Sequence, residues 1–249
     1  MTSEPEIDAL RQRIEEVRRK IASACDRAGR RAEDVRLLPV SKTVPAARLR
    51  AAVAAGLTAF GENKVQEAKD KSEALADLPL RWSVIGHLQT NKAKYVARFA
   101  HEFQALDSLR VAEALDRRLQ IEGRSLDVFI QVNSSGETSK FGLSPDEVPS
   151  FAQSLTAFHS LNVRGLMTLA ILASDMSRVR SCFRRMTDLQ ERLRDSASPR
   201  LSFDELSMGM SGDYEIAVEH GATVVRIGQA IFGARALPDS YYWPEPVRP

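Results

Sequence analysis

Short apolar runs alternate with amphipathic segments along nearly the whole chain, and this alternation restricts the fold more than any other feature of the sequence. Strand-length apolar runs joined through helical segments are typical of parallel βα units, whose strands are buried on both faces. The runs lie near residues 36–42, 57–61, 82–86, 102–107, 126–133, 162–169, 203–207 and 222–227. Helical segments are expected near residues 45–55, 63–76, 91–99, 108–122, 145–158, 175–195 and 211–220.

Eight βα units in a chain of 249 residues fit a TIM (β/α)8 barrel, an α/β fold. An open doubly wound sheet is disfavoured, because no GxGxxG motif follows the first apolar run. We expect a single domain over residues 1–249, with an extra N-terminal helix in 1–29, the barrel in 36–235 and a C-terminal tail in 236–249.

The N-terminal segment predicts one long helix that docks on the barrel. Its apolar residues recur at intervals of three and four and form one stripe: Ile7, Leu10, Ile14, Val17, Ile21 and Ala24. Ser3 and Glu6 are spaced as a capping box, and Gly29 supplies the stop. The opposite face mixes arginines with Glu15 and Glu16, which is typical of a solvated surface and not of a nucleic-acid contact.

Composition excludes several classes of protein. The formal net charge is +2, from 35 basic and 33 acidic residues, so no global field favours nucleic acid or an anionic membrane. No apolar stretch approaches membrane-spanning length. Cys25 and Cys182 are far apart and show no metal-ligand spacing, so we expect no metal site and no disulfide framework. A reducing, cytoplasmic location is predicted.

Lys42 ends the first apolar run and is the candidate reactive group. With a strand period of two, Lys42 shares a face with Leu38 and Val40, and such apolar surroundings penalise an ammonium group. A desolvated lysine offers a free amine that attacks an aldehyde and forms a Schiff base. The alternative is a lysine at a strand end that simply reaches water.

Polar residues follow most of the predicted strands, and the last two strands carry the most specific pattern. In a TIM barrel the functional groups collect at the carboxyl ends of the strands, and the loops after strands seven and eight commonly bind phosphate. Here those loops hold Ser207, Ser211, Gly228 and Gln229, whose hydroxyls and free backbone amides suit a phosphate group. Together with Lys42 they would suit pyridoxal 5′-phosphate (PLP) or a phosphorylated sugar.

Six segments of the chain resemble the PLP homeostasis proteins, a family that shares its barrel with the N-terminal domain of alanine racemase. The segments are VSKTVP, FGENKVQE, WSVIGHLQTNK, VNSSGETSKFG, GLMTLA and LSMGMSGDYEIAVEHGATVVRIGQAIFG. The resemblance implies that Lys42 is the PLP-linked lysine, that Asn63 lies near the ring, and that Arg226 faces the pyridine nitrogen. It also implies that Ser207, Ser211, Gly228 and Gln229 surround the phosphate. One departure is Ser83, where members of the family often carry histidine.

Arg226 bears on whether the chain is a carrier or an enzyme. A guanidinium always carries its charge and donates hydrogen bonds, so it favours an unprotonated ring nitrogen and a weak electron sink. The family resemblance implies a PLP carrier or buffer that acts in PLP homeostasis without robust turnover. It leaves no residue with a catalytic assignment.

Two other functions stay open, a PLP-dependent racemase and a cofactor-free Schiff-base aldolase. In alanine racemase the opposing tyrosine comes from a second domain. The Tyr241–Trp243 stretch of the tail is treated as packing. Candidate partners are PLP itself and PLP-dependent apo-enzymes, with the chain as a monomer or weak dimer.

Overall fold

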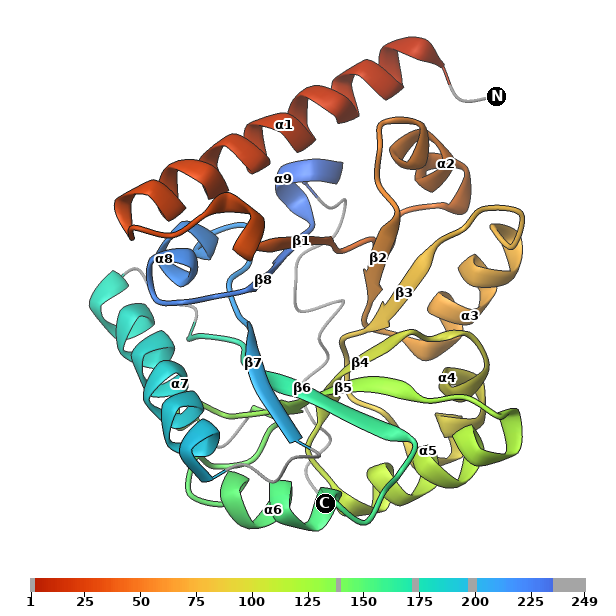
Figure 1. Cartoon of the computed structure of the whole chain (residues 1–249). Helices are drawn as coiled ribbons and strands as arrows, with labels where there is room; N and C mark the ends of the chain where they lie inside the picture. Colours follow the sequence, from red (N-terminus) through yellow and green to blue (C-terminus); the bar gives the residue numbers. More distant parts are fainter. Residues whose placement is uncertain (1–2, 138–139, 172–174, 197–200, 235–249) are drawn as a thin grey trace.

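The structure, a computed structural model, describes residues 3–137, 140–171, 175–196 and 201–234. Within these residues eight strands form one parallel sheet in the order β1-β8-β7-β6-β5-β4-β3-β2. A parallel bridge between Val40 and Gly61 joins the end of β1 to β2, so the two outermost strands meet and the sheet closes. Figure 1 shows the resulting ring of strands with helices around it, and the predicted TIM barrel is confirmed.

All eight predicted strands are present. They are β1 (Arg36–Pro39), β2 (Ala59–Glu62), β3 (Arg81–Val84), β4 (Glu102–Leu106), β5 (Leu126–Gln131), β6 (Leu161–Met167), β7 (Leu201–Ser207) and β8 (Val224–Ile227). Every residue of β4 and of β8 is buried, as expected for strands covered on one face by helices and on the other by the barrel interior.

The helices occupy the predicted segments between the strands. They are α1 (Glu4–Arg27), α2 (Ala46–Ala54), α3 (Val65–Ala74), α4 (Ala93–Phe99), α5 (Leu109–Glu122), α6 (Val148–Leu155), α7 (Met176–Ser196), α8 (Tyr214–Glu219) and α9 (Gln229–Phe232). The short α9 was not expected from the sequence. Two 3₁₀ turns lie at Ala32–Asp34 and Thr90–Lys92.

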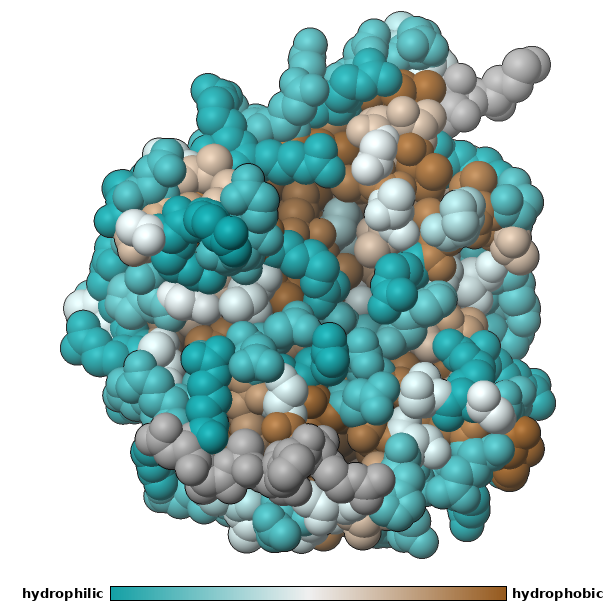
Figure 2. Space-filling view, in the orientation of Figure 1, coloured by the Kyte–Doolittle hydropathy of each residue, from teal (hydrophilic) through white to brown (hydrophobic). Residues whose placement is uncertain are grey.

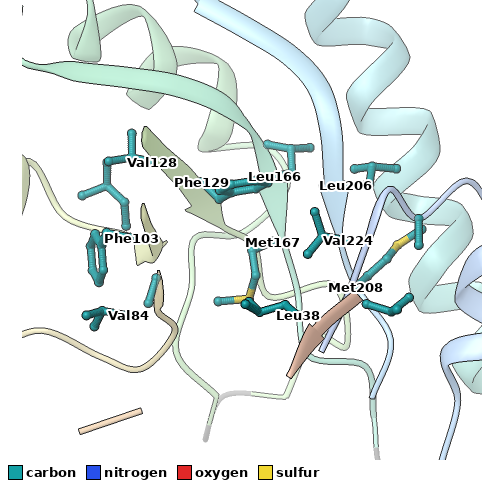
Figure 3. Packing of buried hydrophobic residues seen from close by; sticks show 14 of the residues in the cluster. Leu38, Val84, Phe103, Val128, Phe129, Leu166, Met167, Leu206, Met208 and Val224 are labelled. Carbon is teal, nitrogen blue, oxygen red and sulfur yellow. The ribbon is translucent and has the colours of Figure 1, made fainter. Parts of the chain in front are cut away.

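Hydrophobic side chains fill the layer between strands and helices and part of the barrel interior. Phe103 and Phe129 are fully buried, and Figure 3 shows apolar side chains that come from most of the strands, among them Leu38 and Leu166. Burial of such side chains is the main favourable term that holds the barrel together, at about 1.5–3 kcal/mol for each large aliphatic group.

Helix α1 lies outside the barrel against α2, α8 and α9, as Figure 1 shows. Its predicted stripe is confirmed, since Leu10, Ile14 and Ile21 are buried. Gly29 adopts a φ of +65° just after the helix, a conformation that favours glycine and allows the chain to turn. The predicted capping box is wrong, because Ser3 occupies the N-cap position but its side chain makes no capping hydrogen bond.

Figure 2 shows that hydrophilic residues cover most of the face seen in Figure 1, with smaller hydrophobic areas between them. Both Cys25 and Cys182 are free and buried. In the part of the chain that the structure describes, no helix combines the length and the apolar character needed to cross a membrane. The predicted tail, 236–249, lies outside the described residues, as does residue 235 at the end of the predicted barrel.

Candidate functional site

A pocket of about 220 Å³ opens at the carboxyl ends of β1 and β8. Lys42, Gly228 and Gln229 line it together with Thr43 and Arg48. Lys42 is 6% exposed, so its stem is enclosed by the protein, as the apolar run before it predicted. Three of the seven predicted site residues therefore share one pocket.

The strand ends beside this pocket are tied together by backbone hydrogen bonds. Val40 donates its N–H to the Ile227 carbonyl at 2.8 Å, and Leu38 lies opposite Arg226 in the register of β1 and β8. A Cβ on Gly228 would lie 3.2 Å from the Val40 carbonyl oxygen, which is tighter than side chains normally pack. Glycine at this position therefore lets the two strand ends approach closely and keeps the wall of the pocket free of a side chain.

The turn that carries Lys42 has unusual backbone geometry. Thr43 has a φ of +67°, and within the described ranges it is the one non-glycine residue with a positive φ. Left-handed conformations are uncommon for β-branched residues, and such strain costs about 1–3 kcal/mol. Contacts from the rest of the structure must hold the turn in place.

Those contacts come from four residues that we call the rim network: Ser41, Glu62, Glu67 and Lys71. The Ser41 hydroxyl donates to Glu62 Oε1 at 2.6 Å. Lys71 Nζ donates to the Ser41 carbonyl, to Glu62 Oε1 and to Glu67 Oε1, at 2.6–2.7 Å. The Thr43 N–H donates to Glu67 Oε1 at 2.6 Å. The network thus connects β1, β2 and α3.

Within the rim network, Glu62 is the residue whose burial is most unfavourable in free energy. Its side chain is fully buried, and Oε2 has no hydrogen-bond partner among the described residues. Burial raises the pKa of the Glu62 carboxyl to about 7, although the charge of Lys71 opposes the increase. A carboxyl group with this pKa exchanges its proton near neutral pH.

Arg226 lies inside the barrel and is held by Ser207 at the end of β7 and by Thr168 just after β6. Its NH1 group donates to the Ser207 hydroxyl and its NH2 group donates to the Thr168 carbonyl, each at 2.6 Å. Burial lowers the pKa of Arg226 to about 10, and the charges of Asp213 and Glu102 partly oppose this decrease. The guanidinium therefore keeps its charge at neutral pH.

Ser207 belongs to a chain of hydrogen bonds across the barrel interior. Its hydroxyl donates to Gln104 Oε1 at 2.6 Å, and Gln104 Nε2 donates to Glu102 Oε1. Glu102 Oε1 also accepts from Ser83, and Glu102 Oε2 pairs with Arg36 at 2.7 Å. We call this set the interior network: Arg226, Ser207, Gln104, Glu102, Ser83 and Arg36.

The interior network bears on two predictions from the sequence. Because the Ser207 hydroxyl has one proton and donates it to Gln104, its phosphate contact stays a prediction that requires a change of partner. Ser83, in the position where histidine was expected, hydrogen bonds to Glu102. Sequence reasoning missed Glu102 and Gln104, although two polar residues at alternate positions of an apolar strand are a recognisable signal.

Ser211 connects the loop after β7 to α9. Its hydroxyl oxygen accepts from the Ala230 N–H at 3.4 Å, next to Gln229 in the chain. Asp213 folds the same loop, because its Oδ1 accepts from the Met210 N–H at 2.6 Å. Ser211 therefore lies beside the segment that lines the pocket, without lining the pocket itself.

Asn63 follows Glu62 at the end of β2 and is half-buried. Its backbone lies against Gly86, where an added Cβ would come within 2.2 Å of the Asn63 carbonyl oxygen. The loops after β2 and β3 are therefore in direct contact, and only glycine fits at the crossing. Neither Asn63 nor Arg226 lines the pocket around Lys42.

Comparisons with known proteins place this geometry in a family. Residues 7–236 match the model of the alanine racemase N-terminal domain. The pyridoxal phosphate homeostasis protein of Pseudomonas aeruginosa is 41% identical over 229 residues, which cover 92% of this chain and 97% of that protein.

Two solved structures of PipY from Synechococcus elongatus are also similar, each at 36% identity. The structure without PLP has a TM-score of 0.81 and covers 90% of this chain and all of that one. The structure with PLP bound has a TM-score of 0.75 and covers 86% of this chain and all of that one. The chain belongs to the pyridoxal phosphate homeostasis protein family, within the group defined by the alanine racemase N-terminal domain.

Proposed function

We propose that this chain binds PLP in the pocket at the ends of β1 and β8 and acts as a carrier or buffer of the cofactor. The observation that carries the proposal is that a buried lysine in the turn after β1 shares one pocket with Gly228 and Gln229, which follow β8, the strand next to β1 in the sheet. The PLP-bound structure of the similar PipY protein supports the choice of ligand.

The residues present fit PLP. Lys42 offers a primary amine, and the side-chain-free wall at Gly228 leaves backbone groups accessible next to Gln229. Bound PLP would supply an aldehyde, whose carbon forms a double bond to an amine nitrogen while the carbonyl oxygen leaves as water. Lys42 would provide that nitrogen.

The remaining site residues orient the cofactor. The backbone at Gly228 and Gln229 and the hydroxyl of Ser211 would hold the phosphate, with Ser207 as a further donor. Asn63 would lie near the ring. Arg226 would donate a hydrogen bond to the ring nitrogen. The ring nitrogen would then stay unprotonated, because a charged guanidinium disfavours a second positive charge beside it.

Arg226 also supports a carrier over an enzyme. Many PLP enzymes, such as those that transaminate or decarboxylate, use a carboxylate partner to keep the pyridine nitrogen protonated. Since Arg226 stays charged at neutral pH, this site would make PLP a weak electron sink. We therefore propose binding and release without robust turnover, with PLP-dependent apo-enzymes as candidate recipients. A racemase-like activity is the alternative, to be assayed with amino acids.

One experiment tests the covalent attachment. The purified protein is mixed with PLP, reduced with borohydride and mapped by peptide mass spectrometry. We expect the label on Lys42, no label in Lys42→Ala, and an unchanged label in the matched control Lys92→Ala. A label that remains in Lys42→Ala and maps to Lys64, Lys92 or Lys140 would refute the assignment.

We further propose a cytoplasmic location and a monomeric or weakly dimeric state. The two buried, free cysteines suit a reducing compartment. Cell fractionation tests the location, and light scattering at several protein concentrations tests the oligomeric state. A stable larger assembly would contradict the second proposal.

A further inference from the structure

The residues before and after Lys42 in the chain, Ser41 and Thr43, form hydrogen bonds with charged side chains of β2 and α3. Before it, Ser41 bonds through its hydroxyl to Glu62 and through its carbonyl to Lys71. After it, the Thr43 N–H bonds to Glu67. Lys42 is therefore at the centre of a short turn that is held from both sides.

Lys71 links these contacts to one another, because it bonds to Ser41, Glu62 and Glu67. Its ammonium group has three donor protons, and the three acceptors are the Ser41 carbonyl, Glu62 and Glu67. The same oxygen of Glu67 that accepts from Lys71 also accepts from Thr43. Loss of Glu67 would therefore release the turn after Lys42 and remove one partner of Lys71.

Two energetically unfavourable features occur together at this turn. Thr43 is held in a left-handed conformation, and the buried Glu62 Oε2 has no partner among the described residues. Strained backbone and unsatisfied buried groups persist where the surrounding structure enforces them, and they cluster at functional sites. A turn that only connects β1 to α2 needs neither a left-handed threonine nor a buried carboxyl oxygen without a partner.

The rim network lies outside the pocket that Lys42 lines. Glu67 and Lys71 line a different hollow on the outer side of the barrel, together with Lys64 and Asp70. None of the residues Glu62, Glu67 and Lys71 lines the pocket with Gly228 and Gln229. Their hydrogen bonds to Ser41 and Thr43 are therefore the contacts that link these three side chains to the pocket.

We propose that Glu62, Glu67 and Lys71 are positioning residues that hold the turn of residues 41–43 and thereby direct the Lys42 amine into the pocket. The inference rests on the proposed function and adds residues to it. Because the phosphate and ring contacts come from other elements, the network would govern attachment to the aldehyde and leave the rest of binding unchanged.

Two ligands separate these effects. Pyridoxine 5′-phosphate has the ring and the phosphate of PLP but an alcohol in place of the aldehyde, so its affinity reports only the non-covalent contacts. In Glu67→Ala we expect the dissociation constant of PLP to rise at least about tenfold and that of pyridoxine 5′-phosphate to change less than about twofold. Glu67 is partly exposed, so this variant leaves the core intact.

Two further variants complete the experiment. Glu67→Gln keeps an acceptor oxygen for Thr43 and Lys71, and we expect it to restore the PLP dissociation constant to within about threefold of the wild-type value. Lys69→Met is the matched control, because Lys69 lies on the same helix and pairs with Glu73 on the surface. It should bind both ligands like the wild type.

Amide hydrogen exchange in the ligand-free protein gives a second readout. Peptides that contain residues 41–44 should exchange faster in Glu67→Ala than in the wild type, because the Thr43 N–H has lost its acceptor. Unchanged exchange there, or equal loss of affinity for both ligands, would overturn the positioning role. If wild-type protein bound PLP no more tightly than pyridoxine 5′-phosphate, the Lys42 attachment itself would fail, which is a failure of the proposed function.

Discussion

The rim network and the interior network are both polar and largely buried, with Glu67 and Arg36 as their partly exposed ends, yet they differ in how completely their hydrogen bonds are made. In the interior network, Arg226, Ser207 and Gln104 are linked in series, and Glu102 accepts at both of its oxygens. The rim network leaves Glu62 Oε2 without a partner among the described residues and adjoins the strained Thr43. A fully satisfied network stabilises one structure, whereas the incomplete one lies where we place the chemistry.

The largest expected effect comes from breaking the interior network. Arg226→Met would leave the Thr168 carbonyl and the Ser207 hydroxyl without their buried donor, and Asp213 without its nearby charge. We expect the free energy of unfolding to fall by about 3–5 kcal/mol in urea denaturation. Arg164→Met, which removes a half-exposed arginine from β6, is the control and should cost less than about 1 kcal/mol. Equal costs would contradict the comparison.

The rim network should make the free energy of unfolding depend on pH. Because the pKa of Glu62 rises from 4.5 in the unfolded chain to about 7 in the folded protein, the folded state binds more protons between these values. Stability therefore falls as pH increases from about 4.5 to about 7, by on the order of 3 kcal/mol from this group alone. Burial is the main cause of the raised pKa of Glu62, while the charge of Lys71 lowers this pKa and that of Glu67 raises it.

Glu62→Gln isolates this contribution, because other carboxyl groups titrate equally in both proteins. The difference in unfolding free energy between the variant and the wild type should grow in favour of the variant as pH rises through this range. A difference that stays constant from pH 5 to pH 8 would show that Glu62 does not titrate near neutrality.

Two serines, Ser207 at the end of β7 and Ser211 in the loop after it, sharpen the contrast at a smaller scale. Ser207→Ala removes a hydroxyl that bonds to both Gln104 and Arg226, so we expect about 1–3 kcal/mol of destabilisation. Ser211→Ala should change stability by less than about 0.5 kcal/mol, since its one contact is long and near the surface. It should instead weaken PLP and pyridoxine 5′-phosphate equally. Unequal weakening would show that Ser211 does not act on the phosphate.

A small effect on stability is also expected at Thr43. In Thr43→Gly the strain of the left-handed conformation disappears, but the unfolded chain gains freedom, so stability should change by less than about 1 kcal/mol. Thermal unfolding measures the balance. A loss of several kcal/mol would mean that the Thr43 side chain itself holds the turn.

The sequence predicted the barrel because each strand and each helix is recognised from the spacing of apolar residues within a short segment. Each strand is a short apolar run, and each helix is an amphipathic segment of ordinary length, so the order of elements can be read without tertiary contacts. Lys42, Gly228 and Gln229 were placed near one another because parallel strands bring their carboxyl ends to one edge. The short α9 was missed, since four residues carry no helical period.

The contacts within the site could not be predicted in the same way. The pairing of Glu62 with Lys71 depends on how α3 packs on β2, and no spacing rule relates a strand end to the second turn of the following helix. The partner of Ser207 is likewise decided by side-chain conformation, because its hydroxyl reaches Gln104 from across the barrel. The family resemblance suggested roles for Ser207 and Arg226, but it did not reveal that they bond to each other.

A crystal structure of the protein grown with PLP tests the central claim most directly. The account predicts continuous density from Lys42 Nζ to the cofactor, the phosphate against Gly228 and Gln229, the ring nitrogen facing Arg226, and an unchanged turn at Thr43. Cofactor density joined to another lysine, or located away from the ends of β1 and β8, would contradict it.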